Sequence, residues 1–238
     1  MDEFLSEKEQ IEQIRKWWSE NGRWVIAGVA LGVALLVGWN TWRNFVAERA
    51  AEASALYDEL AAIVEESNPG DATRSRAEDL GRRLKGDYAA TPYDEGGALV
   101  LARLYVSTGA LDEAGAELQY VIDRGTDPEL EMVARLRLAQ VRLQQQRYDD
   151  AEAALAVDSP GAFTARIDEL KGDLAYARGD HAAARAAYER ALAEGEGGLV
   201  NRSYVQMKLD DLAPVEAAGE AADAAAEDDA NAAADGDS

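Results

Sequence analysis

The feature that most constrains the fold is an uncharged run of 19 residues, Trp24 to Trp42, near the start of a 238-residue chain. A helix rises about 1.5 Å per residue, so this run covers roughly 28 Å, close to the roughly 30 Å hydrocarbon core of a bilayer. All five tryptophans of the chain lie at its two ends: Trp17, Trp18, Trp24, Trp39 and Trp42. Because indole rings prefer the headgroup level, the pattern predicts a transmembrane helix over 23–43 with these residues as membrane-interface anchors.

Two other interpretations of the run fit less well. A helix buried in a soluble core rarely stays free of charge for this length with aromatic residues only at its ends. A cleaved signal peptide has an apolar region of about 7 to 15 residues after a short basic start, whereas here an acidic segment precedes the run and no small-residue cleavage site follows it. We therefore expect an uncleaved anchor in contact with membrane lipid.

The charges beside the span predict its orientation, since Lys and Arg close to a span tend to stay in the cytoplasm. Four of them precede it and two follow closely: Lys8, Arg15, Lys16 and Arg23, then Arg43 and Arg49. We expect a cytoplasmic N-terminus, with everything after residue 43 on the far side of the membrane.

Residues 1–22 read as a short amphipathic leader helix. Ser6 and Glu9 have the spacing of a capping box, and apolar residues recur on one helical face. Asn21 and Gly22 favour a turn, so we expect this helix to break before the span. The leader either lies on the membrane surface or a partner, or is simply solvated.

Composition excludes several classes of function. The formal net charge of −22 argues against a nucleic-acid partner, because binding a phosphate backbone relies on Lys and Arg. The chain has no cysteine and a single histidine, and no metal-ligand spacing, nucleotide-binding glycine loop or nucleophile motif occurs. We expect neither a cofactor nor an enzymatic activity.

Beyond the span, the sequence predicts an all-α domain with no strand. Residues 46–67 and 72–86 read as a helical hairpin interrupted at Pro69 and Gly70. Three later segments then align without a gap: LARLYVSTGALDEAGAEL (101–118), LAQVRLQQQRYDDAEAAL (138–155) and KGDLAYARGDHAAARAAY (171–188). Small residues recur at Ala102, Ala139 and Gly172 and at Ala114, Ala151 and Ala184, and bulky ones at Leu118, Leu155 and Tyr188.

The offsets between these segments bracket the 34 residues of a tetratricopeptide unit, which needs small residues where its two helices cross. The repeats resemble that motif more than a plain helical bundle, with 46–86 as a degenerate first unit. Gly109 and Gly179 share a turn position at which the second unit has Gln146, a weaker turn residue. His181 occupies a position that usually packs between the helices.

A final helix over 199–211 is expected to cap the solenoid, with Val200, Tyr204 and Met207 facing the last repeat. Residues 213–238 contain twelve alanines and eight acidic residues but no basic or aromatic one, which predicts a disordered acidic tail. The expected organisation is therefore a leader over 1–22, a transmembrane helix over 23–43, a repeat domain over 44–212 and a tail over 213–238.

Two surfaces are candidates for binding. Small residues in the span would allow another membrane helix to pack closely, although glycine is common in membrane helices in any case. They form a GxxxG pair, Gly28 and Gly32, and a second small-residue pair, Ala34 and Gly38. The first helices of the repeats would line a concave surface without the Lys and Arg cluster that binds a peptide carboxylate, so we expect a helix or an unfolded apolar segment as its guest. The predicted lining is Leu99, Arg103, Val106, Val133, Leu136, Gln140, Leu143, Asp173 and Tyr176.

The order of EQIEQIRKWWSENGRW, the span with GVALGVALL, the repeats and the closing YVQMKLDDL resembles the YfgM family of bacterial inner-membrane proteins, the ancillary subunits of the SecYEG translocon. The resemblance covers residues 3–212 and leaves out the tail. It implies a periplasmic tetratricopeptide domain, association with the translocon and partnership with the periplasmic chaperone PpiD. It also suggests a link to stress signalling through a cytoplasmic response regulator of the Rcs system.

These observations leave two hypotheses open. In the first, the protein is an adaptor that holds chaperone activity near the translocon exit. In the second, it is a negative regulator that binds the response regulator through residues 1–22. A hydrolase is a remote third class.

Overall fold

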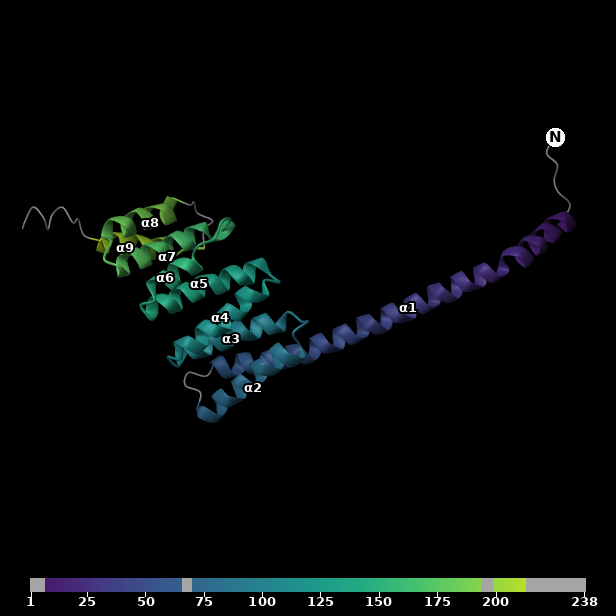
Figure 1. The fold of residues 1–238 in the computed structure, drawn as a ribbon, viewed down its shortest axis with the longest axis horizontal. Coiled ribbons are helices and arrows are strands. Elements are labelled where there is room, and N and C mark those ends of the chain that lie inside the picture. The colour runs from purple at the N-terminus through teal and green to yellow at the C-terminus, as the bar shows by residue number, and fades with distance from the viewer. Residues whose placement is uncertain (1–6, 66–69, 194–198, 213–238) are drawn as a thin grey trace, which may run out of the picture. The chain divides into compact units, whose positions relative to one another are not determined.

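The computed structural model describes residues 7–65, 70–193 and 199–212, and within these ranges the chain is helical and has no strand (Figure 1). The α-helices are α1 Glu7–Glu65, α2 Asp71–Asp87, α3 Tyr93–Ser107, α4 Leu111–Arg124, α5 Pro128–Gln144, α6 Tyr148–Ala154, α7 Thr164–Ala177, α8 His181–Ala193 and α9 Arg202–Asp211. A short 3₁₀ helix, η1 Gly161–Phe163, precedes α7. The all-α class expected from the sequence is confirmed, and the acidic tail predicted over 213–238 lies outside the described residues.

Helix α1 is unbroken, so the predicted break at Asn21 and Gly22 is wrong. The Asn21 side-chain amide donates a hydrogen bond to the Trp17 carbonyl at 3.1 Å, which holds this turn-forming residue inside the helix. The Trp18 indole covers Gly22, whose Cα is close enough that an added Cβ would lie 3.2 Å from Nε1. Two residues that favour turns in isolation are thus held in the helix by the tryptophans one turn earlier.

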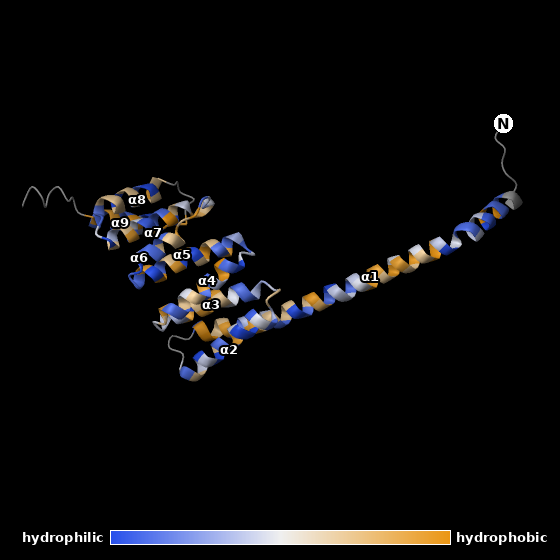
Figure 2. Cartoon of the chain, viewed as in Figure 1, coloured by the Kyte–Doolittle hydropathy of each residue, from blue (hydrophilic) through white to orange (hydrophobic). Residues whose placement is uncertain are grey.

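The middle of α1 is the apolar stretch seen in orange in Figure 2. The helix is long and apolar enough to cross a membrane, and none of its most apolar window is buried within the chain. The chain divides into two compact units, Met1–Leu56 and Tyr57–Ser238, which are described separately below.

The second unit begins with a helical hairpin made by the end of α1 and by α2. Leu60 is buried on α1, and the buried face of α2 consists of the predicted Ala77, Leu80 and Leu84 together with Gly81. Glu59 and Arg76 join the two helices through an ion pair of 2.9 Å. The hairpin expected over 46–86 therefore has its second helix where the sequence places it.

Three further hairpins follow in sequence: α3 with α4, α5 with α6, and α7 with α8. Successive hairpins pack through α4 on α5 and through α5 on α7, as in a solenoid whose repeats contact only their neighbours. The predicted small residues Ala114, Ala139, Ala151 and Ala184 are fully buried at these contacts. A continuous core containing Leu118 and Leu155 joins the first two repeats to α7. The repeat register read from the sequence is confirmed.

The three repeat turns have one backbone conformation. Gly109, Gln146 and Gly179 adopt positive φ angles of 78°, 59° and 80°. This left-handed conformation costs a residue with a Cβ about 1–2 kcal/mol, and Gln146 is the one described residue other than glycine that adopts it. The second repeat therefore keeps the turn geometry at the expense of stability.

Helix α9 caps α8, but through a different face from the one predicted. Val205 and Leu212 are buried and Val200 packs beside them, as expected for Val200, whereas Tyr204 and Met207 are about half exposed. The spacing of Val205, Leu209 and Leu212 also makes an apolar helical face, and this face contacts α8. Tyr204 instead places its ring 4.6 Å from the Lys208 ammonium.

Candidate binding surfaces

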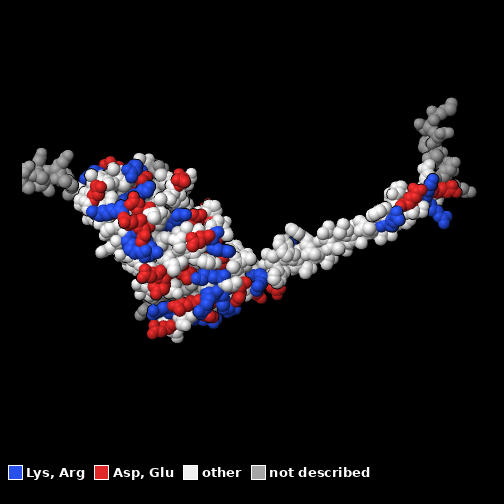
Figure 3. Space-filling model, viewed as in Figure 1, with Lys and Arg blue, Asp and Glu red and all other residues white. Residues whose placement is uncertain are grey.

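The uncharged part of α1 presents its side chains outward. Figure 3 shows this stretch as a white segment without Lys, Arg, Asp or Glu, and the five tryptophans of the chain are all more than half exposed. Trp39 and Trp42 place their ring centroids 5.4 Å apart, and the Arg23 guanidinium lies 5.6 Å from the centroid of the Trp24 ring. Such clusters of aromatic and basic side chains at both ends suit the two interfaces of a bilayer.

The small residues predicted for helix packing lie open on this stretch. A Cβ added at Gly28, Gly32 or Gly38 would meet nothing within 4 Å, and Ala34 is exposed. The surface that they form is therefore free to approach another helix closely.

Three of the nine residues predicted for the concave surface lie together in one hollow. Arg103, Val106 and Gln140 line one hollow between α3 and α5, with a volume of about 290 Å³, which we call the α3–α5 hollow. The remaining lining residues are Ala102, Leu118, Arg137, Val141 and Gln144. Its floor is apolar and buried, and its rim consists of exposed Arg and Gln side chains.

The other six predicted residues are not part of this hollow. Leu99 and Leu136 are buried in the core, and Val133 and Leu143 are half buried. Asp173 is an ion-pair partner of Lys208. Tyr176 is exposed and its ring makes an edge-on contact with His181 at 5.5 Å, so His181 lies at the surface and the expectation that it packs between helices is wrong. Counting one residue per helical turn identified the helices correctly but mixed their buried and open faces.

Arg137 is the lining residue that the sequence prediction missed. It precedes Gln140 by three residues and Gln144 by seven, which places all three on one face of α5. The alignment of repeats matches Arg103 to Gln140 and so conceals that α5 supplies its own arginine one turn earlier. The helical spacing alone would have identified it.

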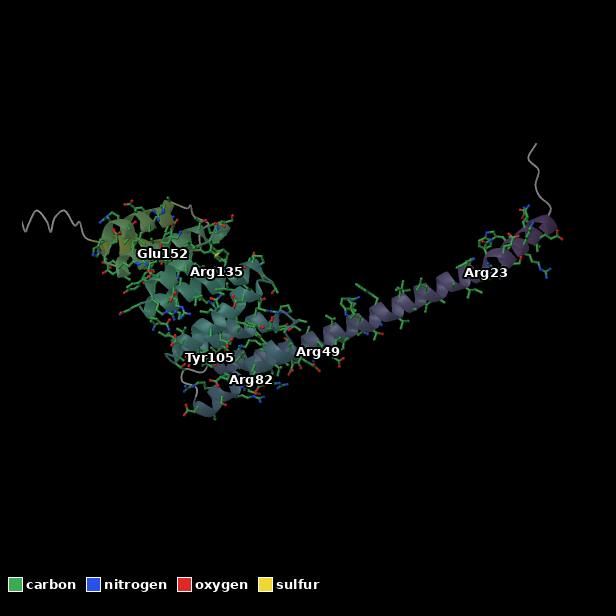
Figure 4. All side chains as sticks on the ribbon, viewed as in Figure 1. Arg23, Arg49, Arg82, Tyr105, Arg135 and Glu152 are labelled. Atoms are coloured by element: carbon green, nitrogen blue, oxygen red, sulfur yellow. The ribbon has the colours of Figure 1, made fainter. Side chains whose placement is uncertain are left out.

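The two arginines of the hollow have no ionic partner among the described residues, which distinguishes them from most arginines of the repeats. Charged residues labelled in Figure 4 illustrate the usual arrangement: Arg82 pairs with Asp79 at 3.2 Å, Arg135 with Glu131 at 2.8 Å, and Glu152 with Arg178 at 2.7 Å. A second hollow beside α5 contains three arginines. Arg135 and Arg147 pair with carboxylates, and Arg142 donates to the Gln145 side-chain oxygen at 2.8 Å. The α3–α5 hollow is thus a site of unneutralised positive charge on a strongly acidic protein.

A buried ionic network fastens α9 to α7. Lys208 donates to Glu169 at 2.9 Å and to Asp173 at 2.6 Å, and the Tyr188 hydroxyl donates to Asp173 at 2.8 Å. Glu169, which also pairs with Arg166, is only 1 % exposed. Burial lowers the pKa of Lys208, but hydrogen bonds from its ammonium to Asp173 and Glu169 outweigh this effect and raise the pKa above its ordinary value. Burial and the neighbouring Asp173 carboxylate raise the pKa of Tyr188 as well.

This network is structural, because its charges are neutralised within the chain. Glu169 and Asp173 share a cation, and the described residues contain no group of three or more His, Cys, Asp or Glu placed to hold a metal ion. Its role is to close the end of the solenoid.

Comparison with known proteins gives one consistent family. A family model described as a tetratricopeptide repeat-like domain matches residues 15–214. Proteins named ancillary SecYEG translocon subunit are similar to this chain over nearly their whole length. The protein from Escherichia coli K12 is 29 % identical, and the match covers 89 % of this chain and 99 % of that protein. The protein from Haemophilus influenzae is 30 % identical, and the match covers 87 % of this chain and 98 % of that protein. The protein of that name from Neisseria gonorrhoeae is 29 % identical over 87 % of this chain and 98 % of its own length. Among solved structures, BtubC from P. vanneervenii matches 80 % of this chain and 92 % of its own with 21 % identity and a TM-score of 0.49. The matched family region thus includes both the apolar part of α1 and the repeats.

Proposed function

This chain belongs to the family of ancillary SecYEG translocon subunits with a tetratricopeptide repeat-like domain, and from this premise we propose that it is a membrane-anchored adaptor of the bacterial inner membrane. It associates with the translocon and links it to periplasmic chaperones such as PpiD, and so assists newly translocated proteins. The observation that carries this proposal is the extent of the match, which spans the apolar part of α1 and every repeat.

The membrane anchor comprises residues 23–43 in this proposal. The leader over 1–22 is cytoplasmic and the repeat domain over 44–212 is periplasmic, as the excess of Lys and Arg before the span favours. Protease added outside spheroplasts should then digest the repeat domain while the cytoplasm stays sealed. Digestion only after lysis would contradict this orientation.

The repeats supply the surface for periplasmic partners. Hairpin solenoids present extended faces built from several repeats, and the α3–α5 hollow offers both apolar floor and charged rim. Anchoring beside the translocon makes weak contacts effective, because confinement raises the local concentration to the millimolar range. A binding role also fits the relatives that the chain matches, whose names describe a translocon subunit.

A regulatory function is the second candidate, and it draws on the leader. Ile11, Ile14, Trp17 and Trp18 are all more than half exposed on the segment before the span. An exposed apolar helical face of this kind suits docking to a cytoplasmic protein, such as a stress-response regulator.

Deleting residues 1–14 separates the two functions, because it removes Ile11 and Ile14 but keeps Arg15, Lys16 and Arg23 before the span to hold its orientation. The adaptor should still recover translocon subunits and PpiD when purified from mildly solubilised membranes, and the regulator should lose its effect on stress-response output. A matched control replaces Ile11 and Ile14 by Ala, which keeps the leader length and removes two of the four exposed apolar side chains named above. If the deletion variant no longer recovers translocon subunits and its stress-response output is unchanged, the result would contradict the proposal that the repeats and the span bind these partners.

A further inference from the structure

We propose that the α3–α5 hollow is a docking site for the chain's own acidic C-terminal segment, residues 213–238. The proposal joins the two unpaired arginines of the hollow to a segment whose composition complements them. It goes beyond the adaptor function, because it gives the hollow an occupant within the same molecule.

The first support is the chemistry of the hollow. Arg103 and Arg137 both line it, no acidic side chain lines it, and neither arginine has an ionic partner among the described residues. Its floor is formed by buried Ala102, Leu118 and Val141. This combination fits a carboxylate flanked by small apolar side chains, since arginine binds carboxylates bidentately and a shallow apolar floor accepts methyl groups.

The second support is the composition of the segment. Residues 213–238 contain eight acidic residues and no Lys or Arg, and most of the others are alanine. Runs of one to three alanines lie between the acidic residues through much of the segment, which supplies the carboxylates and the small apolar groups together. The family model ends at residue 214, so nearly all of this segment is an addition to the shared fold.

The third support is reach. Helix α9 contacts α7 through Lys208, and α7 packs on α5, so two interhelical steps of about 8–10 Å separate the start of the segment from the helix that lines the hollow. A segment of 26 residues spans up to roughly 90 Å when extended. A tether of this length places its carboxylates near the arginines at an effective concentration in the millimolar range.

The consequence is competition. A segment held at millimolar effective concentration by two exposed ion pairs is bound weakly, and an anionic partner with additional apolar contacts displaces it.

Disulfide trapping in the full-length protein tests this inference, because the chain has no cysteine of its own. Gln144→Cys in the hollow is combined with Ala226→Cys in the segment, and the rate of intramolecular disulfide formation is measured in detergent micelles. The matched control pairs Ala226→Cys with Gln119→Cys, which lines the second hollow, whose Arg135 and Arg147 are already neutralised. We expect the Gln144 pair to close faster than the Gln119 pair by about two- to thirtyfold, as two exposed arginine–carboxylate contacts allow.

Charge variants identify the cause. Arg103→Gln with Arg137→Gln should remove the rate difference, as should 0.5 M salt. Arg82→Gln with Arg190→Gln, which changes the net charge equally at exposed positions outside both hollows, should leave it intact. Equal rates for the two cysteine pairs, or a disulfide that forms only between two copies of the chain, would overturn the proposal.

Discussion

A substitution at Gly172 tests how the repeats fit together. A Cβ at this position would lie within 3.0 Å of three atoms of the Tyr188 ring. The ring is buried and its hydroxyl is held by Asp173, so it cannot move aside freely. The equivalent positions in the two earlier repeats hold Ala102 with Leu118 and Ala139 with Leu155, so alanine occurs in the repeats whose second position has leucine, which is smaller than tyrosine.

Overpacking a core costs about 1–3 kcal/mol, and replacing a helical glycine by alanine regains about 0.5–1 kcal/mol. Gly172→Ala should therefore destabilise the α7–α8 hairpin by about 1–2 kcal/mol, which raises the population of its open form about five- to thirtyfold. Adding Tyr188→Leu should relieve the overlap, so the double variant should be more stable than the sum of the two single changes predicts, by about 0.5–3 kcal/mol.

Hydrogen exchange measured by mass spectrometry on α7 and α8 peptides of the full-length protein reads this effect locally. Tryptophan fluorescence would not serve, because every tryptophan lies on α1. Gly86→Ala is the control, since Gly86 is also helical but a Cβ there would meet nothing within 4 Å, and it should slow exchange in α2 slightly. Unchanged exchange in Gly172→Ala, or strict additivity in the double variant, would refute the pairing of these two positions.

Three other predictions concern the turn, the cap and the span. Gln146→Gly should raise the free energy of unfolding by about 0.5–1 kcal/mol, because glycine adopts the left-handed conformation without strain, and Gly179→Gln should lower it by a similar amount. Thermal melting followed by circular dichroism checks both variants, and a loss of stability in Gln146→Gly would contradict the strain at this turn. Burial raises the pKa of Tyr188, and hydrogen bonds to two carboxylates outweigh burial and raise the pKa of Lys208. Each group therefore stabilises the fold below its pKa in the unfolded chain, about 10 for Tyr and 10.4 for Lys, and this stabilisation is lost as the pH rises through its pKa in the folded protein. Melting between pH 8 and 12 should therefore show a smaller alkaline loss in Tyr188→Phe than in the unchanged protein, and parallel curves would argue against this linkage. Gly28→Ile with Gly32→Ile should leave abundance normal but weaken recovery of translocon subunits about fivefold, equivalent to about 1 kcal/mol, and unchanged recovery would show that the span only anchors.

The sequence predicts the repeats well because their constraints are local. Small residues at Ala114, Ala151 and Ala184 are required where helices cross, and the turn residues are required by backbone conformation, so each leaves a periodic pattern. The left-handed Gln146 shows that the pattern locates a turn even where the residue is unfavourable.

Features that depend on which of two apolar faces is buried were predicted less well. Helix α9 has one face with Val205 and another with Tyr204 and Met207, and periodicity alone does not choose between them. The α3–α5 hollow depends on how α3 and α5 come together, so Leu99 and Leu136 were expected at the surface although they are buried. At Asn21 and Gly22, the contacts of Trp17 and Trp18 overcome a local preference for a turn.

The most direct test of the adaptor proposal is crosslinking of the full-length protein in intact membranes, followed by identification of the partners by mass spectrometry. A control chain has residues 24–42 replaced by an unrelated membrane span of equal length. The account predicts that translocon subunits and a periplasmic chaperone are crosslinked to the natural chain, and that the replaced span weakens the translocon products. Crosslinks to other membrane proteins at good yield, with translocon subunits absent from both samples, would contradict it.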